Sequence, residues 1–302
     1  MDPANALPPK VLVTGAGGFV GAAFVARLGS HRRIAMGGPG WREEVAGSDY
    51  RDAVVVHLAA RVHQPRGDAA DFERDNVDKT RVLAEAAAAG GAARFVFAST
   101  VKVHGEETRG APFRPDSPPA PADDYARSKW RAEEALRDIA SRTGLPVVVL
   151  RIPLTYGPGV GGNFRDLLRL ADSGAWLPLA AIRNRRSLVH VRDLADALML
   201  AAGHPQAPGR AYVAAHPVPA STPELVTLIR ASLGRPSRLF PVPVSALEAA
   251  ATVVGLRDRM RRLTRSLEAD PATLVAALGW SPRVSLADGV AEAAAWRGEG
   301  AR

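Results

Sequence analysis

The sequence predicts an α/β fold in which a doubly wound parallel sheet is joined to a smaller mixed α/β C-terminal lobe. Two observations support this. A glycine cluster links the first short apolar run to a helical pattern, and buried β-branched runs then alternate with helical patterns along the chain. Strands that alternate with helices imply right-handed crossovers and parallel pairing, and the ligand crevice of such a sheet lies at the carboxyl ends of its strands.

The predicted elements alternate along the chain. The first half contains strands at 10–14, 54–60, 94–99 and 146–151, helices at 19–28, 77–89 and 125–141, and a loop rich in proline and aspartate at 112–124. The second half is more mixed, with strands at 187–191 and 211–215 and helices at 223–233, 245–254 and 287–296. The alternation is regular only in the first half, so we expect the later helices to build the smaller lobe.

Composition excludes several classes of protein. The 302 residues are 47% hydrophobic and 23% charged, which is typical of a globular chain, and the first ten residues show no apolar signal core. Cysteine is absent, so disulfides, thiolate metal sites and cysteine nucleophiles are excluded. We expect a cytoplasmic protein with no transmembrane segment. The net charge of +8 comes from arginine used throughout the chain, and no nucleic-acid-binding module accompanies it.

The glycine cluster has the spacing of a dinucleotide-binding loop. Gly15, Gly18 and Gly21 fall where a strand becomes a helix, which is the context that such a site requires. Gly15 would permit a tight turn, Gly18 would let a pyrophosphate approach the backbone, and Gly21 would let helix and strand pack closely. A glycine-rich turn with no ligand is the alternative.

Tyr125 and Lys129 are four residues apart in a predicted helix, so their side chains share one face. A free phenol has a pKa near ~10, and a nearby cation favours the phenolate and lowers that value. The pair can therefore exchange a proton with a substrate hydroxyl or carbonyl. Lysine at position 129 stands out because only three other lysines occur in this arginine-rich chain.

These motifs resemble the extended short-chain dehydrogenase/reductases, the NAD-dependent epimerase/dehydratase family. The resemblance rests on GxxGxxG at 15–21, HLAA at 57–60, DNVDKT at 75–80, STVKVHG at 99–105 and YARSK at 125–129, with weaker similarity as far as LGWSP at 278–282. It implies a Rossmann-type NAD(P)-binding domain at 1–160 plus 185–215, and a nucleotide-sugar-binding lobe at 161–184 plus 216–302.

The resemblance also implies roles for particular residues. Thr100, Tyr125 and Lys129 correspond to the catalytic residues, while Lys102, Asn163 and Arg186 are expected at the substrate, the arginine on its diphosphate. Arg183, Arg185 and Arg186 could instead be solvated surface charges. The expected cofactor contacts are Gly15, Gly18, Phe19, Val20, Gly21, Leu58, Ala59, Ala60, Asn76, Ser99, Tyr125 and Lys129.

The motifs look most like those of bacterial polysaccharide enzymes that act at C4 of UDP-sugars. Sugar 4,6-dehydratases carry an Asp-Glu pair directly after the catalytic threonine, but here Val101 and Lys102 occupy those positions, so dehydration lacks its acid and base. We therefore predict reduction of a UDP-4-keto-6-deoxy-N-acetylhexosamine. The alternatives are a UDP-glucose or UDP-N-acetylglucosamine 4-epimerase, and a non-catalytic paralogue that binds nucleotide or nucleotide sugar.

The segment at 34–54 is short for this family. Residues 34–36 form a predicted second strand, followed by Gly37-Gly38-Pro39-Gly40 without the acid that would bind the ribose of NAD, while Arg42 could contact the phosphate of NADP. The cofactor is therefore expected to be NAD or NADP, with a lean to the reductase. About twenty residues cannot hold both a helix and a third strand, so that edge strand is expected to be missing and the adenine pocket thin.

The remaining features have simpler interpretations. The seven histidines lack the spacing of a metal site, and no metal is expected. The basic helix at 257–265 could touch anionic lipid, although a solvated helix is the simpler interpretation. By resemblance, we expect a homodimer formed through a four-helix interface that includes the helix of Tyr125.

Overall fold

A computed structural model describes the backbone of residues 10–62 and 68–299. Its centre is a six-stranded parallel sheet in the order β2-β1-β3-β4-β5-β8. The strands are β1 (Val11–Thr14), β2 (Arg32–Ile34), β3 (Val54–His57), β4 (Arg94–Thr100), β5 (Val147–Ile152) and β8 (Arg210–Val213). The predicted doubly wound α/β fold is confirmed, and the register Val11↔Val54, Val54↔Arg94 and Phe95↔Val147 aligns the central strands.

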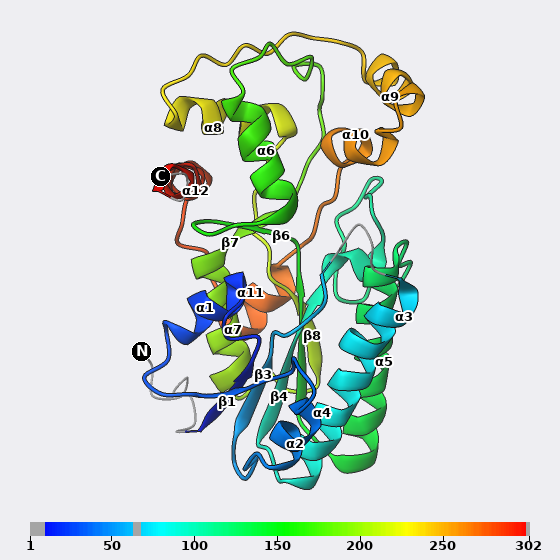
Figure 1. The fold of residues 1–302 in the computed structure, drawn as a ribbon, viewed down its shortest axis with the longest axis vertical. Coiled ribbons are helices and arrows are strands. Elements are labelled where there is room, and N and C mark those ends of the chain that lie inside the picture. Colours follow the sequence, from blue (N-terminus) through cyan, green and yellow to red (C-terminus); the bar gives the residue numbers. More distant parts are fainter. Residues whose placement is uncertain (1–9, 63–67, 300–302) are drawn as a thin grey trace.

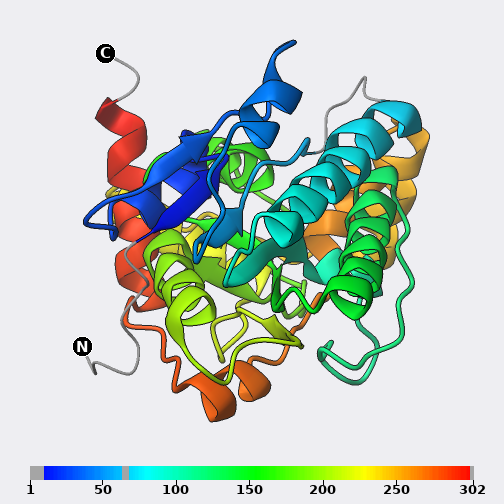
Figure 2. The same cartoon turned by 90° about the horizontal axis from the view of Figure 1, so that it is seen from below.

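Helices cover both faces of the sheet (Figures 1 and 2). One face carries α1 (Phe19–Val25), α7 (Val191–Gly203) and α11 (Ala272–Leu278), and the other carries α2 (Trp41–Ala46), α4 (Lys79–Ala89) and α5 (Asp124–Thr143). The central strands β1 and β3 are buried on both sides and pack against two separate hydrophobic cores. Val13 and Val56 pack toward α1 and α7, whereas Leu12 and Val55 pack toward α4 and α5.

The short segment between β2 and β3, which the structure describes in full, lacks an additional edge strand, as expected. β2 is the edge strand, and within the described residues no further strand lies outside it. A helix was not predicted there, yet α2 forms, because Val45 of this helix is buried against the sheet. The interval is too short for a complete helix and strand, and the chain keeps only the helix.

A second lobe lies beyond the carboxyl ends of the sheet, at the top of Figure 1. It holds the two-stranded parallel sheet of β6 (Leu154–Tyr156) and β7 (Leu188–His190). Its helices are α6 (Gly162–Asp172), α8 (Thr222–Ser232), α9 (Val244–Val253), α10 (Arg257–Thr264) and α12 (Leu286–Glu299). A third hydrophobic cluster, which includes Phe164, Val226 and Val290, fills this lobe. This cluster is separate from the two that flank the central sheet, and it includes Tyr156 of β6 and Leu188 of β7.

Several element bounds differ from those predicted. The helix expected at 77–89 begins as a π-helix, η2 (Glu73–Asp78), which follows α3 (Ala69–Phe72). β3 ends at His57, and the chain then leaves the sheet toward the glycine loop. β7 does not join the main sheet but pairs with β6. The short 3₁₀ helix η3 (Val101–His104) continues directly from β4.

No helix in the described ranges combines the length and the apolar character needed to cross a bilayer.

Candidate active site

The glycine loop makes a tight turn against the end of β3. Gly15 has φ +69°, and the N–H of Gly18 donates to the carbonyl oxygen of Gly15 at 3.0 Å. A Cβ on Gly15 would lie 2.6 Å from the backbone nitrogen of Ala59, and one on Gly21 would lie 2.0 Å from the carbonyl oxygen of Gly15. Both positions therefore require glycine, because no side-chain atom fits there.

A cavity of about 570 Å³ opens beside this loop, at the carboxyl ends of β1, β2 and β3. Its walls comprise Val13, the loop (Gly15, Ala16, Gly17), the end of β2 with the adjoining residues (Arg33 to Gly37), Glu44 of α2, the segment after β3 (His57, Ala59, Ala60, Arg61), and Asp75 and Lys79. Of the expected cofactor contacts, Gly15, Ala59 and Ala60 line this cavity. The glycine cradle and the volume fit a dinucleotide at the crevice of a parallel sheet.

The expected cofactor contacts Asn76 and Ser99 use their side chains within the protein. The amide of Asn76 accepts from the N–H of Arg61 at 2.7 Å and donates to the carbonyl of Arg61 at 3.0 Å and to Ser128 at 2.9 Å. The hydroxyl of Ser128 donates to the carbonyl of Tyr125. Asn76 therefore connects the cavity wall to the first turn of α5.

Replacing Gly15 with alanine is expected to weaken NAD(P) binding by at least about tenfold, because the new methyl group would clash with Ala59 and force φ out of the left-handed region. The matched control is Gly17→Ala, since a Cβ on Gly17 meets no atom within 4 Å. Titration of each variant with NADH and NADPH, followed by fluorescence, measures the effect. Equal affinity of the two variants would contradict it.

Thr100, Tyr125 and Lys129 lie at the carboxyl end of β4 and in the first turns of α5. Thr100 ends β4, and its Oγ1 accepts the N–H of Lys102 at 3.3 Å. The ring of Tyr125 packs edge-on against Phe72, with centroids 6.4 Å apart, and the ammonium of Lys129 lies 3.9 Å from the centre of the Phe97 ring. Neither the Tyr125 hydroxyl nor the Lys129 ammonium has a hydrogen-bond partner among the described residues, which leaves both available to ligands.

Burial sets the protonation of this pair. It raises the pKa of Tyr125 to about 12, with the nearby charge of Asp123 acting in the same direction. It lowers the pKa of Lys129 to about 7, although the carboxylate of Glu133 acts against this. From the sequence, the Tyr125 pKa was expected to fall. In the protein alone, burial and the charge of Asp123 keep Tyr125 a neutral phenol near neutral pH.

The lowered pKa of Lys129 predicts a pH-dependent stability in the absence of ligands. The unfolded chain binds this proton up to about pH 10.5, whereas the folded protein releases it from about pH 7, so the free energy of unfolding rises between these values. Lys129→Met should therefore stabilise the protein by more than about 1 kcal/mol near pH 7, with a smaller gain near pH 9. Urea unfolding at both pH values measures the two differences, and Lys10→Met, at a half-buried lysine paired with Asp49, serves for comparison. A Lys129→Met effect that is constant over this range would contradict the prediction.

A buried ion pair anchors the helix that carries Tyr125 and Lys129. Glu133, one turn after Lys129, receives a hydrogen bond from Arg151 of β5 at 2.6 Å and another from the hydroxyl of Ser99. The side chains of Glu133 and Arg151 are only 2% and 4% exposed. Arg151 also contacts His104 at 2.9 Å and donates to the carbonyl of Pro115. One network thus holds α5, β5 and η3 together beneath the site.

Lys102, Glu106 and Asp123 form a second charged cluster. The Lys102 ammonium contacts Asp123, which caps α5, and lies 2.6 Å from Glu106. Burial lowers the pKa of Arg186, the charge of Glu106 opposes that shift, and Arg262 adds to it. Glu106 therefore pairs with Lys102 and also acts electrostatically on Arg186. This arrangement can receive an anionic ligand between the two lobes.

Asn163 lies exposed in the first turn of α6, and within the described residues no hydrogen bond joins it to Lys102 or Arg186. Conversely, the sequence patterns did not indicate Arg33, Glu44, Lys79 and Arg262. Lysine against an arginine background could have indicated Lys79, which donates to the carbonyl of Met36 at 2.9 Å and pairs with Asp75. The others carry no pattern in the sequence.

Comparison with protein families matches residues 41–215 to the NAD dependent epimerase/dehydratase family. Among characterised proteins, the chain is 33% identical over 312 residues to a UDP-glucose 4-epimerase of Vibrio cholerae, with 95% of each chain covered. It is 31% identical to a dTDP-glucose 4,6-dehydratase of Streptomyces griseus, over 95% of this chain and 93% of that one.

Solved structures show the same fold. The structure of a dTDP-glucose 4,6-dehydratase from Streptomyces venezuelae, determined with NAD bound, superposes with a TM-score of 0.76 at 24% identity. The superposition covers 96% of this chain and 97% of the other.

Proposed function

Because the chain belongs to the NAD-dependent epimerase/dehydratase family, we propose that it is an NAD(P)-dependent oxidoreductase that acts at C4 of a UDP-sugar. The proposed reaction reduces a UDP-4-keto-6-deoxy-N-acetylhexosamine in surface polysaccharide synthesis. The reduced cofactor, NADH or NADPH, held by the glycine loop and the cavity beside it, would supply the hydride and leave as NAD+ or NADP+.

The observation that carries this proposal is the set of groups around Thr100. Tyr125 and Lys129 lie on one face of α5, their polar groups have no hydrogen-bond partner in the described part of the chain, and Thr100 ends the neighbouring strand. Tyr125 would donate the proton to the carbonyl oxygen at C4, and Thr100 would hydrogen-bond the same oxygen. Val101 and Lys102 follow Thr100, and Lys102 is held by Glu106 and Asp123, which disfavours a dehydratase.

The protonation of Tyr125 favours reduction. A phenol with a pKa of about 12 remains protonated near neutral pH and can act as a proton donor. Arg186 and Lys102 would bind the diphosphate and the sugar, and we place Asn163 at the nucleotide end. The second candidate is a UDP-sugar 4-epimerase, because the relative from Vibrio cholerae carries that activity in its name.

The deciding experiment mixes the purified protein with UDP-4-keto-6-deoxy-N-acetylglucosamine and either NADPH or NADH. Oxidation of the cofactor with formation of the reduced sugar supports the reductase. Tightly bound NAD together with interconversion of UDP-glucose and UDP-galactose supports the epimerase. Absence of any cofactor binding would overturn both. The choice of cofactor is tested in the same assay, since Arg33 suits the extra phosphate of NADP and Glu44 suits the ribose hydroxyls of NAD.

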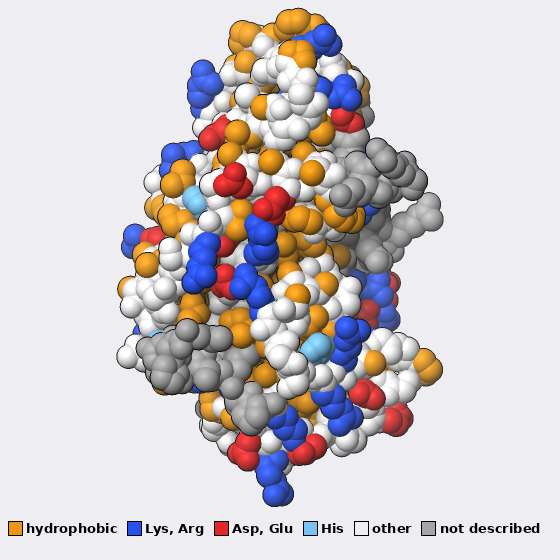
Figure 3. Space-filling view, turned by 90° about the vertical axis from the view of Figure 1, so that its left-hand side faces the viewer, with side chains coloured by type: hydrophobic (Ala, Val, Ile, Leu, Met, Phe, Trp, Pro, Cys, Tyr) orange, Lys and Arg blue, Asp and Glu red, His pale blue; other side chains and the backbone are white. Residues whose placement is uncertain are grey.

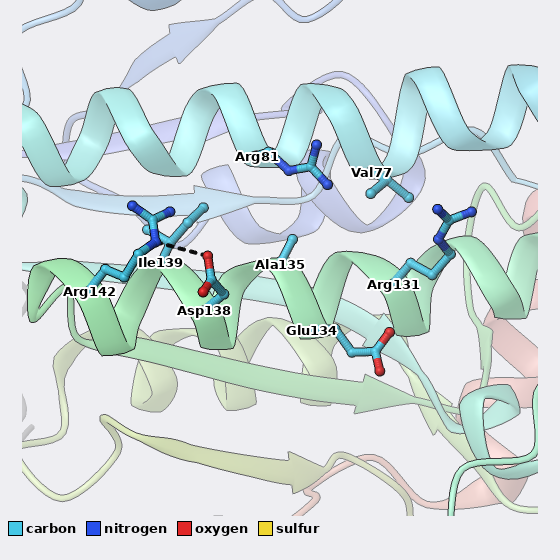
Figure 4. A pocket seen from close by; sticks show the side chains of 8 residues that line it. All are labelled: Val77, Arg81, Arg131, Glu134, Ala135, Asp138, Ile139 and Arg142. Atoms are coloured by element: carbon cyan, nitrogen blue, oxygen red, sulfur yellow. Dashed lines mark hydrogen bonds and ion pairs between the residues drawn. The ribbon is translucent and has the colours of Figure 1, made fainter.

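We also propose that the chain forms a homodimer through the outer face of α4 and α5. A groove of about 420 Å³ lies between these helices (Figure 4). It is lined by Val77, Arg81, Arg131, Glu134, Ala135, Asp138, Ile139 and Arg142. Both arginines and carboxylates line it, so a second copy placed about a twofold axis could set arginines of one copy against carboxylates of the other.

A dimer of this kind should dissociate on adding salt, because its interface would be largely ionic. Light scattering at low and high ionic strength measures the mass directly. Glu134→Arg should weaken the dimer, whereas Glu43→Arg, on α2, should not. A monomer at every concentration and ionic strength would contradict the proposed interface.

A further inference from the structure

The corner between α9 and α10 exposes three large apolar side chains in succession. Val253 is 87% exposed, Val254 66% and Leu256 46%. Scattered exposed apolar residues are normal on a protein surface, but three within four residues form a local patch. Val253 is also the most exposed large hydrophobic residue in the described part of the chain. The inner face of α9 is packed normally, since Leu247 and Ala251 are buried in the lobe.

Arginines directly follow this patch. Arg257, Arg259 and Arg261 of α10 are exposed, and none forms an ion pair within the part of the chain that the structure describes. Arg265, directly after α10, differs from these three arginines, because its guanidinium pairs with the carboxylate of Glu248 at 2.7 Å. The corner therefore presents unpaired positive charge beside an apolar tip.

The position of the corner leaves it accessible. α9 and α10 stand at the side of the upper lobe, away from the central sheet (Figure 1). The space-filling view in Figure 3 faces the opposite side of the molecule, where basic and acidic side chains are interspersed among apolar ones. Docking through the α9–α10 corner would leave the outer face of α4 and α5 uncovered.

We propose that the α9–α10 corner docks the protein on an anionic lipid surface. Val253, Val254 and Leu256 would enter the headgroup region, and the three arginines would contact the lipid phosphates. Charge argues against a second copy of the chain as the occupant, since the same arginines would then face one another. A nucleic acid would satisfy the arginines but would leave the valines in water.

Flotation with vesicles tests this. The full chain should float with vesicles of phosphatidylglycerol and phosphatidylcholine, and at least about tenfold less with phosphatidylcholine alone. The double variant Val253→Asp/Val254→Asp and the triple variant Arg257→Glu/Arg259→Glu/Arg261→Glu should each lower the bound fraction by a similar factor. All five positions are exposed, so the variants should fold, and circular dichroism checks this.

The control is Val218→Asp, because Val218 is 67% exposed and lies outside the corner. It should bind vesicles as the unchanged protein does. Three results would overturn the proposal: no binding to anionic vesicles, equal binding by the double variant, or a concentration-dependent mass without vesicles that the double variant abolishes. The last would identify the corner as a contact between copies of the chain.

Discussion

Replacing Tyr125 with phenylalanine should lower turnover of the nucleotide sugar by roughly 10²–10⁴-fold, because the proposed proton donor is lost while the ring is kept. That loss corresponds to about 3–5 kcal/mol in the activation barrier. The hydroxyl has no hydrogen-bond partner among the described residues, and the ring still packs against Phe72. The variant should therefore fold normally and keep its affinity for NAD(P).

Measurement of kcat with the substrate that the wild-type protein accepts, together with a thermal melt, tests this prediction. The matched control is Tyr212→Phe, since Tyr212 lies in β8 at the opposite edge of the sheet from the cavity and its hydroxyl donates to the carbonyl of Gln206. An undiminished kcat for Tyr125→Phe would refute the proposed acid. A loss of folding in the same variant would show that Tyr125 is structural.

The parts of the molecule that depend on local sequence could be predicted. The strand, glycine turn and helix at the start of the chain have their own signature, and the spacing of Tyr125 and Lys129 places them on one helical face. The missing edge strand was predicted by counting residues between β2 and β3. These features need only neighbouring residues, which is why pattern and length identified them.

The parts that depend on tertiary burial could not be predicted. The pKa of Tyr125 rises because the surrounding structure excludes water, and nothing in YARSK specifies that exclusion. The cavity takes Arg33 from β2, Glu44 from α2 and Lys79 from α4, three segments that the sequence alone does not bring together. β7 was predicted as a strand, but its partner β6 lies more than thirty residues earlier, and pairing over that distance has no local signal.

The buried ion pair of Glu133 and Arg151 could not be predicted either, since its members are 18 positions apart in the chain. Breaking this pair is expected to have the largest effect on the free energy of unfolding. Glu133→Gln should destabilise the protein by about 3–5 kcal/mol, because the guanidinium of Arg151 would remain buried without its counter-charge. Glu43→Gln is the control, since Glu43 of α2 is exposed, has no ion pair in the described part of the chain and lies outside the proposed dimer interface.

Urea unfolding of both variants measures this difference, and a Glu133→Gln change below about 1 kcal/mol would contradict it. The same variant also tests how the pair acts on the site. Glu133 opposes the lowering of the Lys129 pKa, so its neutralisation should lower that pKa further. Wherever enough folded protein remains, the basic limb of turnover against pH should move to lower pH. If stability falls but the pH profile stays fixed, the pair only holds α5 to β5, and the charge of Lys129 is set by burial alone.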